Sequence, residues 1–273
     1  MIFRIKHKTV FKYNNPPLSA IQKLRLTPRN EKNQIILNWD IDVKGCSIEL
    51  ETLDYHGNKV HLCKTKDETR EITITCSGRL NINDSKGIVG LHDDKIPLDL
   101  FKYSSSNYTK PGSGIKKILS NIKKETNKIK SDIERLNYLS NYILKLVKYS
   151  KGKTSIKTSC EDAIKIGFGV CQDHVHIFLS CVRELGFPGR YVSGYLMLDD
   201  TNIQEASHAW AEVYIEHLGW VGFDISNSIS PDNRYVKLAV GFDYSDVIPI
   251  SGIRVGDSVE KINTKIIIES KQY

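Results

Sequence analysis

The segments SHAWAEVY (residues 207–214) and GWVGFD (residues 219–224) decide the fold of the second half of this chain. The first alternates as a strand does from His208 onward, and the second has the form of its hairpin partner, ending at Asp224. In an antiparallel pair, the start of one strand lies beside the end of the next. His208 and Asp224 are therefore expected at one edge of a sheet, which is the geometry that a His–Asp pair requires.

A cysteine precedes this hairpin in the segment GFGVCQD (residues 167–173), where a glycine-containing turn becomes a helix. The helix is predicted over residues 171–185, with Gly186 as its stop. The unpaired N–H groups and the positive dipole end at a helix start stabilise a thiolate. Cys171 is accordingly either a reactive thiol or a small buried apolar residue, and this segment alone does not decide between the two.

The joint placement of the three side chains favours the reactive thiol. A thiol enzyme needs a general base close to the sulfur and a third group that orients the base. The sequence therefore predicts a catalytic triad in which Cys171 is the nucleophile, His208 the general acid and base, and Asp224 the orienting partner of His208.

The chain is predicted to contain two domains joined by a short linker. Residues 1–102 alternate with a period of two between turn-like breaks, which indicates an antiparallel β domain. Residues 103–114 are a cluster of turn formers without periodicity and are interpreted as the linker. Residues 115–273 are then a core of helices packed on an antiparallel sheet, and the fold class is α+β.

Within this core, apolar residues at three- and four-residue intervals predict a helix across residues 131–149. The helix at 171–185 comes next. Strand patterns are then expected at residues 190–198, 208–216, 220–224, 247–255 and 262–268.

Composition limits the classes of protein to consider. Of the 273 residues, 40% are hydrophobic and 26% are charged, as in folded soluble proteins. The net charge of +7 reflects 39 Lys and Arg against 32 Asp and Glu. The lysines across residues 116–157 lack aromatic residues at base-stacking intervals, so we expect a solvated basic face and no nucleic-acid binding. The excess of positive charge is compatible with an acidic substrate.

The cysteines and the first residues of the chain indicate the cellular compartment of the protein. The six cysteines show no paired spacing and are interpreted as reduced. The first residues alternate apolar and basic side chains as a strand does, without the apolar run and cleavage site of a signal peptide. No apolar stretch approaches the roughly 18 to 20 residues of a membrane-spanning helix. We therefore expect a cytoplasmic protein without membrane contact.

The motifs around the three candidate residues resemble those of a known family. The segments GVCQD (169–173), ASHAWAEVY (206–214) and GWVGFD (219–224) are similar to the transglutaminase-like core, and the chain resembles bacterial transglutaminase-like proteins with a β-rich N-terminal domain. Further similarity lies in LRLTPR (24–29), DYHGN (54–58), RYVSGYL (190–196) and VGFDYSDV (240–247).

This resemblance implies a papain-like α+β core in which Cys171 attacks a carboxamide or peptide carbonyl and His208 shuttles the proton. The leading hypothesis is a cysteine protease or amidohydrolase that forms a thioester acyl-enzyme and acts on a peptide or amide substrate. The same triad also serves acyl transfer from protein glutamine to an amine, as in transglutaminases, and deamidation. The alternative to these enzyme hypotheses is a non-catalytic binding or scaffolding protein.

The tetrahedral intermediate of such a reaction needs at least two donors for its oxyanion. The backbone N–H of Cys171 is one candidate, and the second is sought at Tyr149 or at a backbone amide near Phe168. Gln172 is placed either to bond a substrate carbonyl or to cap the turn. Trp210 alternates with His208 on its strand and is expected to form a wall of the cleft.

Metals and other cofactors are not indicated. His174 and His176 follow Cys171, but on a helix of about 100° per residue they point about 160° apart. No CxxC or HxxxH ligand set occurs elsewhere, and no carboxylate cluster has the spacing of a calcium loop. We expect no metal ion and no cofactor, and the sequence carries no signal for an oligomeric state.

Overall fold

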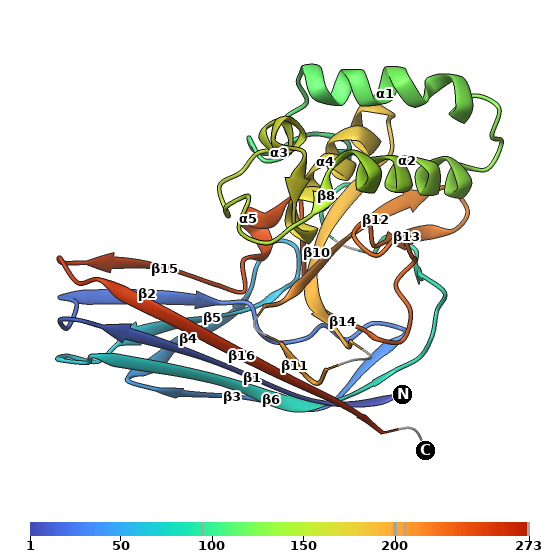
Figure 1. Ribbon diagram of the computed structural model, residues 1–273. Coiled ribbons are helices and arrows are strands. Elements are labelled where there is room, and N and C mark those ends of the chain that lie inside the picture. Colours follow the sequence, from blue (N-terminus) through green and yellow to red (C-terminus); the bar gives the residue numbers. More distant parts are fainter. Residues whose placement is uncertain (94, 199–200, 205, 272–273) are drawn as a thin grey trace.

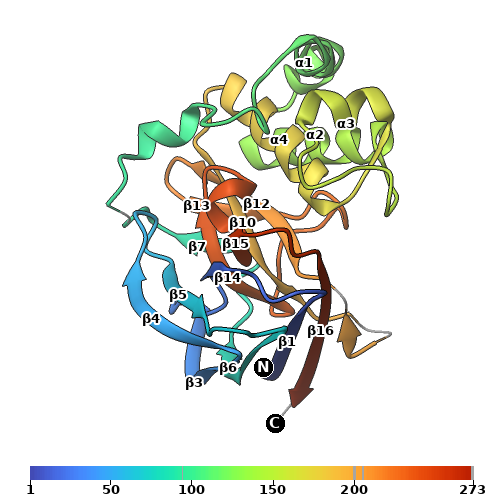
Figure 2. The same cartoon turned by 90° about the vertical axis from the view of Figure 1, so that its left-hand side faces the viewer.

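The computed structural model describes residues 1–93, 95–198, 201–204 and 206–271. Helices gather on one side of a central antiparallel sheet, and long strands built largely from the N-terminal half extend on the other side (Figures 1 and 2). This arrangement confirms the α+β class predicted from the sequence.

The core sheet carries the candidate active-site strands. Its strands are antiparallel and lie in the order β14-β10-β12-β13-β7. The predicted hairpin is confirmed, because β12 begins at His208 and pairs with β13, which ends one residue before Asp224. The bounds are Tyr235–Gly241 for β14, Gly189–Leu196 for β10, His208–Ile215 for β12, Gly219–Phe223 for β13 and Ile88–Gly90 for β7.

The helical layer is built around one almost fully buried helix, α4 (Cys171–Glu184), which contacts β12 and β10. The predicted helix at 131–149 is observed as α2 (Asp132–Leu146), where the Ser131 side chain caps the first turn by accepting from Glu134 N. The helix α1 was not predicted, although its apolar residues recur every three or four positions between the lysines. The other helices are α1 (Ser113–Thr126), α3 (Cys160–Ile166), α5 (Tyr244–Val247) and the 3-10 helix η1 (Leu98–Lys102).

The N-terminal strands form a sheet of order β11-β16-β1-β6-β3 and a sheet of order β15-β2-β5-β4. Their alternating residues enclose a second core that includes Phe3, Ile5, Leu24, Cys63 and Ile74. The bounds are Ile2–Tyr13 (β1), Ser19–Leu24 (β2), Gln34–Lys44 (β3), Cys46–Leu53 (β4), Lys59–Thr65 (β5), Glu71–Ile82 (β6), Ile203–Gln204 (β11), Ile250–Val255 (β15) and Glu260–Lys271 (β16).

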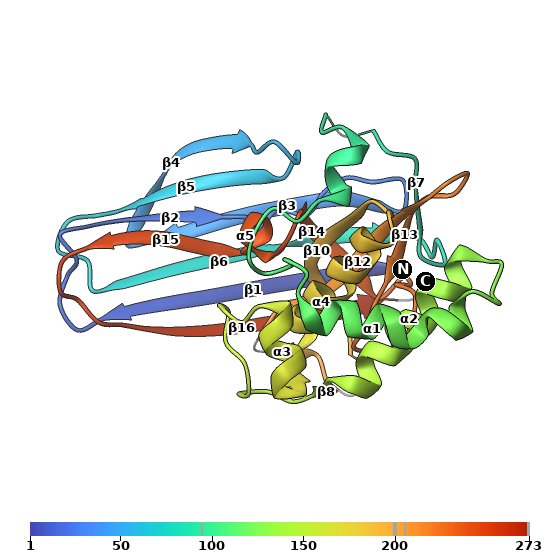
Figure 3. The ribbon, with the colours of Figure 1, turned by 90° about the horizontal axis from the view of Figure 1, so that it is seen from above.

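The last two strands return to the N-terminal sheets, whereas the sequence analysis assigned residues 115–273 to the core. β16 pairs with β1 along its whole length, from Ile2 opposite Lys271 to Tyr13 opposite Glu260, and β15 pairs with β2 (Figure 3). The alternation of apolar residues identifies a strand but not its partner, and β1 and β2 offer unpaired backbone groups that these strands satisfy.

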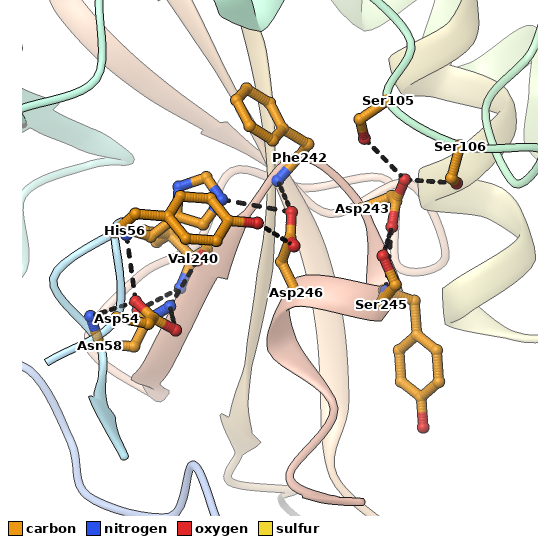
Figure 4. A network of polar contacts seen from close by, with 12 residues as sticks. Asp54, His56, Asn58, Ser105, Ser106, Val240, Phe242, Asp243, Ser245 and Asp246 are labelled. Carbon is orange, nitrogen blue, oxygen red and sulfur yellow. Dashed lines mark hydrogen bonds and ion pairs between the residues drawn. The ribbon is translucent and has the colours of Figure 1, made fainter. Parts of the chain in front are cut away.

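Side-chain amides join the N-terminal strands to the free edge of β14. Asn58 donates from Nδ2 to Val240 O (2.7 Å) and accepts from Val240 N at Oδ1 (2.9 Å), as a neighbouring strand would (Figure 4). Gln34 pairs with the backbone of Lys237 in the same way, with both distances at 2.8 Å. These bonds attach the first half of the chain to the core sheet.

The loop that carries Asn58 is held by two acidic residues. Asp54 accepts from the backbone N–H groups of His56 (3.1 Å) and Asn58 (2.9 Å), which shapes the turn. Asp246 on α5 then accepts from Phe242 N (2.9 Å) and contacts His56 Nε2 (3.2 Å) (Figure 4). The segments 54–58 and 240–247, which the sequence analysis singled out, therefore contact one another at the junction of the two halves.

Candidate active site

The chain turns sharply into α4 at the candidate nucleophile. Cys171 is the first residue of the helix, and its side chain is partly exposed. The Asp173 carboxylate accepts from Val170 N (2.8 Å) and from the Thr154 hydroxyl (2.7 Å), which fixes the first turn. A Cβ at Gly169 would lie 2.8 Å from the Asp173 Cβ, so glycine is required there. The sulfur therefore stands at a rigid helix N-terminus, where backbone N–H groups favour negative charge.

His208 and Asp224 meet at the end of the β12–β13 hairpin. His208 Nε2 lies 2.6 Å from Asp224 Oδ2. The carboxylate is buried and accepts additional bonds from the Tyr235 hydroxyl (2.7 Å), Asn227 Nδ2 (2.7 Å) and Asn227 N (3.1 Å). These donors hold Asp224 in one orientation and stabilise its negative charge.

The imidazole is placed between two groups that favour its cation. Burial lowers the pKa of His208, but hydrogen bonds to Asp224 and to the Cys171 thiol outweigh burial and raise that pKa to about 10. Since Nε2 contacts Asp224, Nδ1 is the nitrogen left for the thiol. The pKa of Asp224 is lowered in turn, because its hydrogen bonds outweigh the opposing effect of burial. The site thus favours an imidazolium that is hydrogen-bonded to the Asp224 carboxylate.

Trp210 packs beside the histidine. Its ring lies nearly parallel to the imidazole, with centroids 6.4 Å apart, and meets the Tyr235 ring edge-on at 5.3 Å. A Cβ at Gly194 would lie 2.6 Å from the tip of the indole, so the absence of a side chain there makes room for the ring. Trp210 is almost fully buried and limits the movement of the imidazole.

The remaining sequence candidates lie close to the nucleophile. Tyr149 is half exposed, and its pKa is raised by burial and by the nearby Cys171 and Asp224. Its hydroxyl therefore keeps its proton near neutral pH and can donate a hydrogen bond. Gln172 donates from Nε2 to the backbone oxygen of Ile156 (3.3 Å), in the loop that precedes α3.

Sequence reasoning missed the residues that support the triad from behind. Tyr235 and Asn227 bond Asp224, but neither stands in a recognisable spacing from it. His174 lies one turn after Cys171 and contacts Val147 O and Ser226 Oγ, each at 2.8 Å. It thereby ties the nucleophile's helix to the loop that follows Asp224. The sequence signal that could have identified His174 is its spacing from Cys171, which places both residues on one face of the helix.

His174 and His176, the two histidines that follow Cys171, are both buried. Burial lowers the pKa of His174, and burial lowers that of His176 to about 3, so both rings are neutral. Across the described residues, no group of three or more His, Cys, Asp or Glu side chains is arranged to hold a metal ion. In that same part of the chain, no helix combines the length and apolar character needed to cross a membrane.

Two family models match this chain. Residues 120–225 match the model described as Transglutaminase-like superfamily, and residues 3–81 match the Bacterial transglutaminase-like N-terminal region. The chain therefore contains a transglutaminase-like core and a bacterial transglutaminase-like N-terminal region. The resemblance drawn from the sequence motifs is confirmed.

Similar proteins span nearly the same length. An uncharacterized protein of Mycobacterium leprae is 26% identical over 265 residues, which cover 93% of each chain. An uncharacterized protein of Mycobacterium tuberculosis is 26% identical over 285 residues, covering 92% of this chain and 87% of the relative. A crystal structure described as "a Putative Cysteine Protease from Cytophaga hutchinsonii" has a TM-score of 0.77 and 22% identity, covering 100% of this chain and 92% of that chain. The last comparison establishes the shared fold.

Proposed function

We propose that this protein is a cysteine-dependent hydrolase of amide bonds in peptides or related amides. The observation that carries the proposal is the position of Cys171 beside His208, whose imidazole is in turn hydrogen-bonded to Asp224. The shared fold with the Cytophaga hutchinsonii protein, described as "a Putative Cysteine Protease", supports the same class of activity.

The reaction begins with attack of the Cys171 sulfur on the substrate carbonyl. The carbon–nitrogen bond then breaks, His208 gives its proton to the departing amine, and a thioester remains on Cys171. In the second half, His208 takes a proton from water, the water oxygen attacks the thioester, and the carbon–sulfur bond breaks. Asp224 keeps the imidazole oriented and stabilises its cation throughout.

The oxyanion of each tetrahedral intermediate needs donors that are already in place. The Cys171 N–H has no partner within α4 because it belongs to the first turn. The Tyr149 hydroxyl is the second donor in this proposal, since it stays protonated and lies near the sulfur. Trp210 packs against the imidazole of His208 and limits its movement.

Transfer of the acyl group to an amine, and deamidation of glutamine, use the same thioester. They differ only in the acceptor and in the amide that is attacked, so the product decides among the three reactions. A purely scaffolding protein would not need this arrangement. The buried Asp224 carboxylate accepts four hydrogen bonds, one of them from His208, and His208 lies beside the Cys171 thiol.

Replacement of Cys171 by alanine is expected to abolish both thiol labelling and turnover. A thiol-directed amide probe should modify wild type at Cys171, and a glutamine-containing peptide should yield hydrolysis or deamidation products by mass spectrometry. Repeating the reaction with a primary amine reveals acyl transfer as an added mass. Cys181→Ala serves as the control. The Cys181 thiol is fully buried and is expected to remain unlabelled in wild type, so its removal should leave the labelling of Cys171 unchanged. Absence of labelling on folded wild-type protein contradicts the proposal.

The rate of amide hydrolysis should stay high to about pH 9 and decline as pH rises through about 10. His208 has a raised pKa of about 10, so it holds the proton needed by the leaving amine below that pH and loses it above. A pH profile of kcat/KM for a peptide amide measures this. A decline already centred near pH 6.5 in wild type contradicts the assignment of the raised pKa to His208.

A further inference from the structure

A small pocket lies directly beside the start of β12, where the two halves of the chain meet. Its volume is about 200 Å³. One wall is formed by Ala206 and Ser207, which immediately precede His208, and another by Pro249 and Ile250 after α5. The pocket is therefore attached to the candidate general base by a single peptide bond.

The floor of this pocket comes from the N-terminal strand β1. His7, Thr9 and Phe11 project from its buried face, and Ile262 and Thr264 of the paired strand β16 complete the lining. The first and last strands of the chain thus contribute to a cavity next to the core active site. This contribution exists only because β16 returns to β1.

The polar groups of the floor are already paired with one another. His7 Nδ1 contacts the Tyr195 hydroxyl (2.8 Å), His7 Nε2 contacts Thr9 Oγ1 (3.0 Å), and Thr9 Oγ1 contacts Thr264 Oγ1 (3.1 Å). Burial lowers the pKa of His7 to about 4, so its ring is neutral. A ligand therefore meets an uncharged surface with few free donors, which suits an apolar group.

A second wall of the pocket follows the helix α5. Pro249 and Ile250 follow α5 closely, and on that helix Tyr244 N donates to His176 Nε2 (3.3 Å) of α4, the helix that begins at Cys171. The pocket is smaller than the roughly 300 to 1,000 Å³ of sites for drug-sized ligands. Its size matches one side chain instead of a whole substrate.

We propose that this pocket is a substrate subsite, which receives one uncharged apolar side chain of a peptide whose scissile amide lies at Cys171. The inference rests on the proposed function and adds the class of side chain that the enzyme selects. It also gives the N-terminal β strands a direct part in specificity. A substrate with glycine at the corresponding position loses the contact with the floor.

The test uses peptides in which a thiol-reactive vinyl sulfone replaces the scissile amide. One residue on each side of the vinyl sulfone is varied among Gly, Ala, Leu and Phe, and the rate of Cys171 modification is followed by mass spectrometry. Iodoacetamide, which is too small to need the pocket, gives the reference rate for each variant. In wild type, Leu or Phe at one of the two positions is expected to label about tenfold faster than Gly.

Two variants and one control connect this preference to the pocket. Ala206→Phe fills the pocket from an exposed position and should remove the preference, while Ile262→Ala widens it and should favour Phe over Leu. Asn263→Ala lies on the opposite face of β16 and should behave as wild type. Equal rates for Gly and Leu probes, or a preference that survives in Ala206→Phe, overturn the subsite. Failure of iodoacetamide and all probes to modify folded wild type overturns the proposed function instead.

Discussion

Replacement of Asp224 by asparagine should lower kcat/KM for amide hydrolysis by about 10³- to 10⁴-fold. The carboxylate accepts from His208, Tyr235 and Asn227 and carries the charge that stabilises the histidine cation. An amide of the same shape presents an NH2 group to some of these donors and offers no charge. The imidazole then loses both its orientation and the main cause of its raised pKa.

The measurement is a comparison of steady-state kinetics for purified wild type and Asp224→Asn on one peptide amide. Asp99→Asn is the matched control, since its carboxylate is exposed and is paired with Lys102 on the surface. The decline at high pH should also move to lower pH in Asp224→Asn, because removal of Asp224 lowers the pKa of His208. A folded Asp224→Asn variant with less than a tenfold loss contradicts the orienting role.

Substitution of Glu212 by glutamine is expected to lower the free energy of unfolding by about 3–5 kcal/mol. The Glu212 carboxylate is almost fully buried between Arg190 Nε (2.8 Å) and Lys237 Nζ (2.6 Å). Lys237 is also paired with Glu31 (2.6 Å), so the network joins the core sheet to the N-terminal half. Loss of one negative charge leaves two buried cations insufficiently compensated.

Urea titrations of the two proteins measure this difference in unfolding free energy. Glu51→Gln is the matched control, because its pair with Lys59 is about half exposed and its loss should cost less than about 1 kcal/mol. A similar small cost for both variants contradicts the structural importance of the buried network.

The same network predicts a pH dependence of stability. Burial raises the pKa of Glu212, but Lys237 and Arg190 outweigh it and lower that pKa to about 2. The stabilisation is complete above the ordinary value of about 4.5 and is lost as pH falls from there toward 2. Wild type should therefore lose stability more steeply than Glu212→Gln in this interval, and parallel curves contradict the assignment.

Much of the local structure could be predicted because it depends on neighbouring residues. The hairpin, the start of α4 and the helix α2 follow from alternation, helical periodicity and the chemistry of the first helical turn. These patterns also placed Cys171, His208 and Asp224 near enough to be considered together. The positions of strands β1 and β16 were likewise visible as alternating stretches.

The tertiary structure alone decided which strands pair and which side chains meet across long separations. β16 joins β1 about 250 residues away, Asn58 bonds Val240, and Tyr235 bonds Asp224. None of these contacts has a local signal, because a strand pattern fixes which face is buried but leaves its partner open. Sequence by itself therefore determined the strands β10, β12 and β13, the helices α2 and α4, and the candidate triad. The fold supplied the buried partners that orient the triad and the pocket that the two ends of the chain build beside it.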